Sequence, residues 1–366
     1  MIRSSLIGSA LRAILLCSIV AVVPIMVNAS GSFIGPLKIV KVASTVPGNG
    51  DINPYGVAVV RRSIGALVMG DILVSNFNNA ANQQGTGTTI VQVTPAGAVS
   101  VFAQIDASNL PGACPGGVGL TTALVVLYTG WVIVGSLPTT NGNAATSQAG
   151  CLIVLNNQGK VVETISGSPI NGPWDMTAFD EGTSVKLFVT NVLNGIVAAN
   201  GTVVNSGTIV RIDLTVTGND APRELARTII GSGFPARTDP SALVIGPTGV
   251  GLTDDGTLYV ADTLENRIAA IPDAINRQDS AGTGVTVSQG VAINGPLGLT
   301  ITPNGDILVA NGGDGNIVET TTSGSQVAVM TIEPTGAGTL FGVTIGLYGN
   351  GIYFVDDGTN TLSLLR

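Results

Sequence analysis

Apolar residues along this chain occur in short runs separated by glycine, asparagine and other turn-forming residues. After residue 30 the 3.6-residue periodicity of long amphipathic helices is nearly absent. Runs of about five apolar residues bounded by such turns are typical of β-strands, and Asp255-Gly256 and Asn304-Gly305 are hairpin signals. The pattern therefore predicts an all-β protein.

A short signature recurs six times along the chain. It consists of a small or turn residue, an aliphatic residue and then Thr or Ala, and its copies begin at Gly56, Gly119, Asp175, Gly251, Gly298 and Gly342. Successive copies lie 63, 56, 76, 47 and 44 residues apart. The shortest spacings match propeller blades of about 40–50 residues, and polar insertions at 77–88, 136–149, 192–207 and 272–284 account for the longer ones.

The two ends of the chain supply complementary pieces of one blade. The sixth copy ends at Arg366 after three predicted strands, whereas residues 37–42 form an isolated strand before the first copy. Pairing 37–42 with 361–365 would close the ring and remove two open strand edges. The sequence therefore predicts one six-bladed β-propeller of four-stranded antiparallel blades over residues 30–366.

Two segments resemble the NHL repeat of six-bladed propellers. They are 296–311, PLGLTITPNGDILVAN, and 251–262, GLTDDGTLYVAD, the latter continued by Asn266-Arg267-Ile268. Copies one and six match less well, and copies two and three match loosely. The resemblance implies a gluconolactonase-like or streptogramin-lyase-like fold. That fold hosts lyases, lactonases, scaffolds and binding modules, so it does not specify an activity.

The first 29 residues have the features of a secretory signal peptide. Arg3 and Arg12 precede an apolar stretch at 13–27, and Ala29 completes a small-residue cleavage motif. The alternative is a membrane anchor, but fifteen apolar residues fall short of the roughly 20 that a spanning helix needs. We therefore expect export to the periplasm or the extracellular medium, with no membrane association after cleavage.

Composition excludes several partners and chemistries. The net charge of −8 argues against nucleic acid and anionic membranes as partners. The chain contains no histidine, which removes Ser-His-Asp and Cys-His catalysis and imidazole zinc sites. Within the resembled families, this absence argues against streptogramin lyases, amidating lyases and paraoxonase-type lactonases, whose sites depend on histidine.

Carboxylate and amide oxygens are the remaining candidate metal ligands. In a four-stranded meander, the start of the first strand and the end of the second lie at the same end of the blade. We therefore expect one channel mouth to gather Asn76, Asp175, Asn191, Asp262, Asn311 and Asp356. Such oxygens suit Ca²⁺ or Mg²⁺. Gluconolactonase-like propellers hold a divalent cation with Glu, Asn and Asp in a comparable place, but no equivalent glutamate is identifiable in this chain.

The alternative role for these residues is turn capping through side-chain-to-backbone hydrogen bonds, and we favour it for most of the six. Copy three differs, because Asp175 stands where most copies have glycine and Trp174 precedes it. A tryptophan beside a carboxylate at a channel mouth predicts a surface for a sugar or a cation. Alternatively, Trp174 fills space between blades.

Cysteine usage gives one further expectation. Cys114 and Cys151 remain after signal cleavage, and an even number in an oxidising compartment predicts a disulfide; two buried thiols are the alternative.

Two functions fit the sequence. The first is a monomeric, non-enzymatic binding module for a small molecule, a carbohydrate or a protein. The second is a divalent-metal-dependent, lactonase-like hydrolase that uses the Asn/Asp ring.

Overall fold

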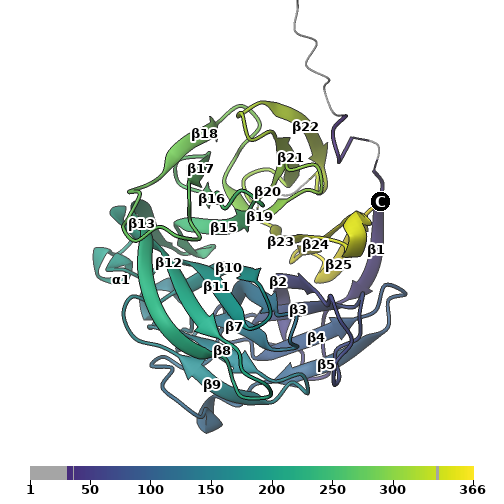
Figure 1. The fold of residues 1–366 in the computed structure, drawn as a ribbon, viewed down its shortest axis with the longest axis vertical. Coiled ribbons are helices and arrows are strands. Elements are labelled where there is room, and N and C mark those ends of the chain that lie inside the picture. The colour runs from purple at the N-terminus through teal and green to yellow at the C-terminus, as the bar shows by residue number, and fades with distance from the viewer. Residues whose placement is uncertain (1–30, 36, 335–337) are drawn as a thin grey trace, which may run out of the picture. The chain divides into compact units, whose positions relative to one another are not determined.

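Six antiparallel sheets surround a central axis, as Figure 1 shows for the computed structural model. The structure describes residues 31–35, 37–334 and 338–366, and the predicted signal peptide at 1–29 lies outside these ranges. No helix in the described ranges is long and apolar enough to cross a membrane. The predicted six-bladed β-propeller is confirmed for the unit from Ser32 to Arg366.

Each blade runs from an inner strand beside the axis to an outer strand, and the third blade has a fifth strand. In chain order the blades are β2 (Ile52–Val59), β3 (Ile72–Asn78), β4 (Thr89–Val93) and β5 (Val99–Gln104); β6 (Leu120–Val126), β7 (Val132–Ser136), β8 (Cys151–Leu155) and β9 (Val161–Ile165); β10 (Pro173–Asp180), β11 (Ser184–Asn191), β12 (Val204–Thr215), β13 (Arg223–Asp239) and β14 (Leu243–Ile245); β15 (Pro247–Leu252), β16 (Leu258–Asp262), β17 (Arg267–Ile271) and β18 (Val285–Gln289); β19 (Pro296–Ile301), β20 (Ile307–Asn311), β21 (Asn316–Thr320) and β22 (Gln326–Thr331); β23 (Leu340–Ile345), β24 (Ile352–Asp356), β25 (Thr361–Leu365) and β1 (Ile39–Ser44). Helical turns are short: η1 (Ala107–Asn109), η2 (Ala144–Thr146), α1 (Ile196–Ala199) and η3 (Leu347–Gly349).

The N-terminal strand completes the last blade. Strand β1 pairs antiparallel with β25, with Ile39 opposite Leu365 and Ser44 opposite Thr361. In Figure 1 the two strands lie side by side, although they come from opposite ends of the coloured chain. Ring closure by the N-terminal strand is therefore confirmed, and the blade count holds.

Strand pairing corrects the position of the signature in two copies. Copy five serves as the reference, because its signature aliphatic residue, Leu299, pairs with the centre of the second strand as expected. In copy four the residue that pairs in this way is Val250, which places that signature two residues earlier than predicted. In copy two the equivalent residue is Leu124, four residues later than predicted. Spacing misassigned both copies because each contains a second small–aliphatic pair nearby.

Glycine in the signature reflects how closely neighbouring inner strands approach. A Cβ atom at Gly298 would collide with the carbonyl oxygen of Phe341, and one at Gly342 with the carbonyl oxygen of Tyr55. Each glycine therefore lets one blade contact the backbone of the next. Asp175 occupies the same position in blade three, so a side chain enters the channel there.

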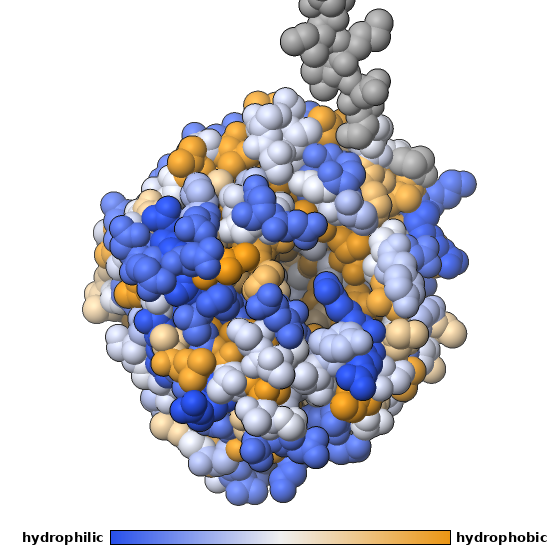
Figure 2. Space-filling model, viewed as in Figure 1, coloured by the Kyte–Doolittle hydropathy of each residue, from blue (hydrophilic) through white to orange (hydrophobic). Residues whose placement is uncertain are grey.

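The two faces of the ring carry different loops. We call the face where the inner strands begin the connector face, because the second and third strands of each blade are joined there. The predicted insertions 77–88, 136–149 and 192–207 lie largely within these connectors, whereas 272–284 joins β17 to β18 on the opposite, hairpin face. Figure 2 shows the ring hollowed at its centre on the face in view, with many hydrophilic residues around the hollow.

Cys114 and Cys151 form a disulfide with their Cα atoms 5.1 Å apart. The bond ties the segment before β6 to the first residue of β8, where the connector of blade two ends.

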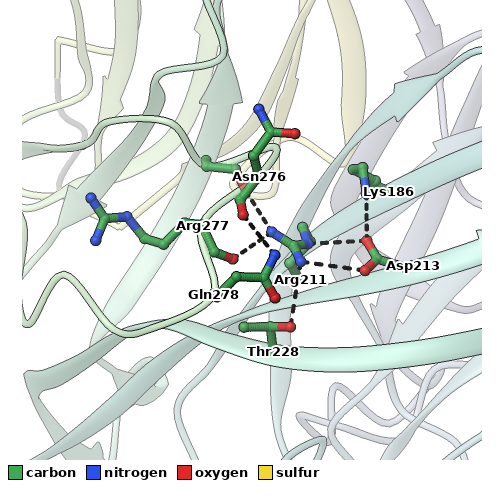
Figure 3. A network of polar contacts seen from close by, with 8 residues as sticks. Lys186, Arg211, Asp213, Thr228, Asn276, Arg277 and Gln278 are labelled. Carbon is green, nitrogen blue, oxygen red and sulfur yellow. Dashed lines mark hydrogen bonds and ion pairs between the residues drawn. The ribbon is translucent and has the colours of Figure 1, made fainter.

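A buried arginine attaches the hairpin-face insertion of blade four to blade three (Figure 3). Arg211 on β12 is only 2% exposed. Its Nη1 donates to the carbonyl oxygens of Ala274 at 3.2 Å and Arg277 at 2.7 Å, and its Nε lies 3.0 Å from Asp213 Oδ1. Lys186 also contacts Asp213, at 3.0 Å. One guanidinium thus satisfies two loop carbonyls and a carboxylate.

Replacing Arg211 with Met is expected to lower the free energy of unfolding by about 3 kcal/mol, because the buried carbonyl of Ala274 and the partly buried carbonyl of Arg277 lose their donor and Asp213 keeps only Lys186 as a cationic partner. Urea denaturation measures the change. Arg211→Lys keeps the charge but lacks the fork of donors, so it should recover only part of the loss. An Arg211→Met protein as stable as the wild type would show that the network contributes nothing.

Candidate functional site

A stack of aromatic side chains lies inside the ring near the connector face. Tyr55 on β2 is sandwiched between Phe341 and Phe77, with ring centroids 3.8 Å and 4.4 Å away. Trp174 contacts Phe341 in a tilted arrangement at 6.4 Å. All four rings are at least nine-tenths buried and belong to one apolar cluster. The stack comes from blades one, three and six, so it fills the axis rather than one blade.

A cavity of about 500 Å³ opens at the connector face beside this stack. Tyr55, Leu297 and Phe341 line it from the inner strands, and Ala242 and Ile245 add apolar surface from blade three. The remaining lining residues are mostly polar residues and glycines: Asn53, Asn78, Asn82, Gln84, Ser241, Thr263, Gly295, Gly312, Gly313, Gly338, Asp357 and Gly358. This volume falls within the range of small-ligand sites.

The connector of blade one reaches across the mouth of the cavity. The side-chain amide of Gln84 donates to the carbonyl oxygen of Ser241 in blade three at 3.2 Å. Thr139 of the blade-two connector holds the same segment, donating from Oγ1 to the Gln84 carbonyl at 2.6 Å and from N–H to Gly85 at 2.9 Å. The insertions of blades one and two therefore narrow the opening.

Among the described residues that line this cavity, Asp357 is the one with a charged side chain. Burial, and next the negative charge of Asp356, raise the pKa of Asp357 to about 7, against the lowering effect of the Gly358 N–H. Burial also raises the pKa of Tyr55 well above its usual range, and the charge of Asp357 adds to the effect. Within the described part of the chain, no lysine or arginine forms an ion pair with Asp357.

Five of the six residues of the predicted Asn/Asp ring lie at this face, the exception being Asp175, and two of the five are acidic. Asp262 forms an ion pair with Arg267 at 2.9 Å. Both carboxylate oxygens of Asp356 accept hydrogen bonds, from the Gly358 N–H at 3.0 Å and the Thr359 hydroxyl at 2.7 Å. The contact with the Gly358 N–H is the side-chain-to-backbone capping expected of such a residue.

The asparagines tie the end of each second strand to the segment that enters the same blade. Asn76 donates to the carbonyl oxygen of Thr45 at 3.0 Å, and Asn311 to that of Ala292 at 2.7 Å. Asn191 accepts from the N–H of Asn171 at 3.2 Å. All three asparagines are fully buried, so their role is to lock the blade at the connector face.

The two acidic ring residues at this face already have protein partners. Asp262 pairs with Arg267, and the oxygens of Asp356 accept two donors. The Oδ1 atoms of Asn76, Asp262 and Asn311 are buried without a hydrogen-bond partner among the described residues, so a Ca²⁺ or Mg²⁺ ion at the ring stays a prediction. Over the residues described, no group of three or more His, Cys, Asp or Glu side chains is placed to hold a metal ion. We therefore derive no chemistry through a metal here.

Trp174 and Asp175 do not form the joint surface that the sequence suggested. Trp174 is 4% exposed and packs into the aromatic stack, whereas the carboxylate of Asp175 lines a second cavity. Strand β10 bulges between Pro173 and Met176, and adjacent side chains of a strand point to different surroundings. Asp175 therefore lies apart from the connector-face mouth, and Trp174 packs at the axis against Phe341 of blade six.

The second cavity, of about 840 Å³, occupies the channel toward the hairpin face and is lined by all six inner strands. Oδ1 of Asp175 accepts the N–H of Met176 at 2.8 Å, and Oδ2 accepts that of Val250 at 3.1 Å. Burial raises the pKa of Asp175 to about 8 against these two hydrogen bonds. This carboxyl is therefore mostly neutral at pH 7, unlike an ordinary aspartate.

The cavity lies at the face that the sequence predicted for the Asn/Asp ring, but Tyr55, Phe341 and Asp357 were not among the predicted site residues. A usable signal was present, because Tyr55, Trp174, Leu297 and Phe341 each stand directly before the signature glycine or its equivalent. Asp357 lies in the turn between β24 and β25. Nothing in the sequence indicated that its carboxyl faces a cavity.

No protein-family model and no curated protein matches this chain by sequence. Solved structures match it at low identity over most of its length. A gluconolactonase from Xanthomonas campestris has a TM-score of 0.56 and 13% identity, covering 91% of this chain and 90% of its own. A streptogramin B lyase has a TM-score of 0.52 and 15% identity, covering 90% and 97%. Regucalcin from Agrobacterium tumefaciens, a calcium-binding protein, has a TM-score of 0.53 and 14% identity, covering 89% and 93%. The chain therefore shares the six-bladed propeller fold of these proteins.

Proposed function

We propose that this propeller is a binding module for a small molecule, held in the connector-face cavity. The observation that carries the proposal is a preformed cavity of about 500 Å³ with an apolar floor and one half-buried carboxyl, that of Asp357, which has no ion-pair partner among the described residues. Ligand sites are typically apolar clefts with a few polar groups that fix orientation. Export of the protein, which rests on the signal peptide, remains a prediction.

Filling the cavity tests this function. A screen of small molecules by saturation-transfer NMR or thermal shift against the mature protein is expected to find ligands. Their affinity should fall at least tenfold in Ala242→Trp, because the indole would occupy the cavity that Ala242 lines. Ala145→Trp, at an exposed position of the blade-two connector, is the matched control. Ligands that bind both variants like the wild type would place the site elsewhere.

A lactonase-like hydrolase is the second candidate, favoured by the shared fold with a gluconolactonase. The half-buried carboxyl of Asp357 is suited to general-base work near neutral pH, since a base acts best when its pKa lies close to the working pH. Assays of lactone hydrolysis with and without added Ca²⁺ or Mg²⁺ separate the two candidates. Turnover that disappears in Asp357→Asn would favour the hydrolase over the binding module.

A further inference from the structure

Among the described residues that line the connector-face cavity, Asp357 is the single charged side chain, and none is a lysine or an arginine. The neighbouring ionisable groups that act on Asp357 or are affected by it are Asp356 on the same turn and Tyr55 on β2, neither of which carries a positive charge. An anionic ligand would therefore meet repulsion without any compensating cation.

The carboxyl of Asp357 is also only partly solvated. The residue is half-buried, burial raises the pKa of its carboxyl, and no described arginine or lysine pairs with it. Removing part of the water from an unpaired carboxylate costs free energy that a cation placed beside it would recover. The most favourable occupant of this position is therefore a positively charged group.

The rest of the lining defines the body of the ligand. Leu297, Phe341 and Ile245 supply apolar surface, and Tyr55 offers an edge rather than a face because Phe341 and Phe77 cover both sides of its ring. The raised pKa of Tyr55 keeps its hydroxyl protonated and able to accept a hydrogen bond from an N–H donor. These contacts suit a compact apolar group that carries a charged nitrogen.

From this geometry we infer that the connector-face cavity binds an organic ammonium ion with an apolar body, its nitrogen held by Asp357. The inference rests on the proposed binding function and specifies the ligand class. It predicts discrimination by charge among molecules of nearly equal shape.

Three matched probes test the ligand class: 2-phenylethylamine, 2-phenylethanol and phenylacetate, titrated calorimetrically into the mature protein. The amine is expected to bind at least tenfold more tightly than the alcohol, and phenylacetate should not bind. Asp357→Asn should remove the preference for the amine. Asp254→Asn, which removes a carboxylate from the hairpin-face cavity instead, is the control and should leave the preference intact.

The pH dependence gives an independent readout. Phenyltrimethylammonium carries a permanent charge, so any change in its binding reports the protein. The pKa of Asp357 is about 7, so the fraction of its carboxyl that is deprotonated rises roughly tenfold from pH 6 to pH 8. The affinity of the wild type for phenyltrimethylammonium should rise by the same factor, whereas that of Asp357→Asn should stay constant.

The outcomes separate the ligand class from the binding function. Equal binding of the amine and the alcohol, blocked by Ala242→Trp, would overturn the ligand class while leaving the binding function in place. An amine preference that survives in Asp357→Asn would overturn the role of Asp357. Failure of all three probes to bind at 10 mM would overturn the inference, and the wider screen would then decide the binding function separately.

Discussion

Deletion of residues 30–43 is expected to abolish cooperative folding of the mature protein or to leave it aggregated. The deletion removes most of β1, whose pairing with β25 closes the ring. It also removes Ile34, which is fully buried, and the N–H groups of Phe33 and Ile34 that donate to the Glu319 carboxylate at 2.8 Å and 3.0 Å. The expected loss, on the order of 5 kcal/mol or more, is comparable with the whole stability of a domain.

Circular dichroism with urea titration measures the loss, with the chain beginning at residue 30 as the reference. A synthetic peptide of residues 30–46 added in trans should restore part of the stability, since it supplies the missing strand. A deleted protein that melts like the reference would show that the terminal strand does not stabilise the ring. Glu319→Gln isolates the anchoring of Phe33 and Ile34 and should cost far less than the deletion.

Asp175 is expected to make the protein less stable as the pH rises. An aspartate has a pKa near 3.8 when unperturbed, whereas burial raises that of Asp175 to about 8 in the folded protein. Between these values the folded protein retains a proton that the unfolded chain has released. Stability from the neutral carboxyl is therefore complete at low pH and is lost as the pH approaches 8.

The free energy of unfolding should fall by about 4 kcal/mol more in the wild type than in Asp175→Asn between pH 5 and pH 8. Urea titrations at several pH values measure the two slopes. Other carboxyls contribute to both proteins equally, so the difference isolates Asp175. Asp254→Asn, an exposed change at the same cavity, should keep the wild-type slope. Parallel curves for Asp175→Asn and the wild type would contradict a buried neutral carboxyl.

The blade count and ring closure could be predicted because they depend on local, repeated features. Each second strand carries its own apolar run and turn residues, and residues 37–42 had no partner other than the unfinished sixth blade. The position of the signature in copies two and four could not be predicted in the same way. The inner strands contain bulges of different length, so the sequence does not show which of two nearby small residues begins the signature. Only the pairing of the inner strand with Val134 in copy two and with Val260 in copy four identifies it.

The candidate site was predictable to the level of a face. Alternation of turns along an antiparallel meander placed the ends of the second strands at one mouth, and the cavity is lined by residues that directly follow Asp262, Asn311 and Asp356. In the turn after β24, one residue caps the turn and the next faces the cavity. Asp356 and Asp357 are chemically identical, and only their surroundings assign the first to its turn and the second to the cavity.

The sequence by itself determined the strands, their grouping into six blades and the exclusion of histidine chemistry, because these follow from local pattern and composition. Tertiary structure alone decided which side chains meet at the axis. Tyr55, Phe77 and Phe341 come from opposite ends of the chain, and their stacking depends on closure of the whole ring. The elevated pKa values of Asp175 and Asp357 are likewise absent from the sequence, since burial is a property of the assembled blades and not of either aspartate.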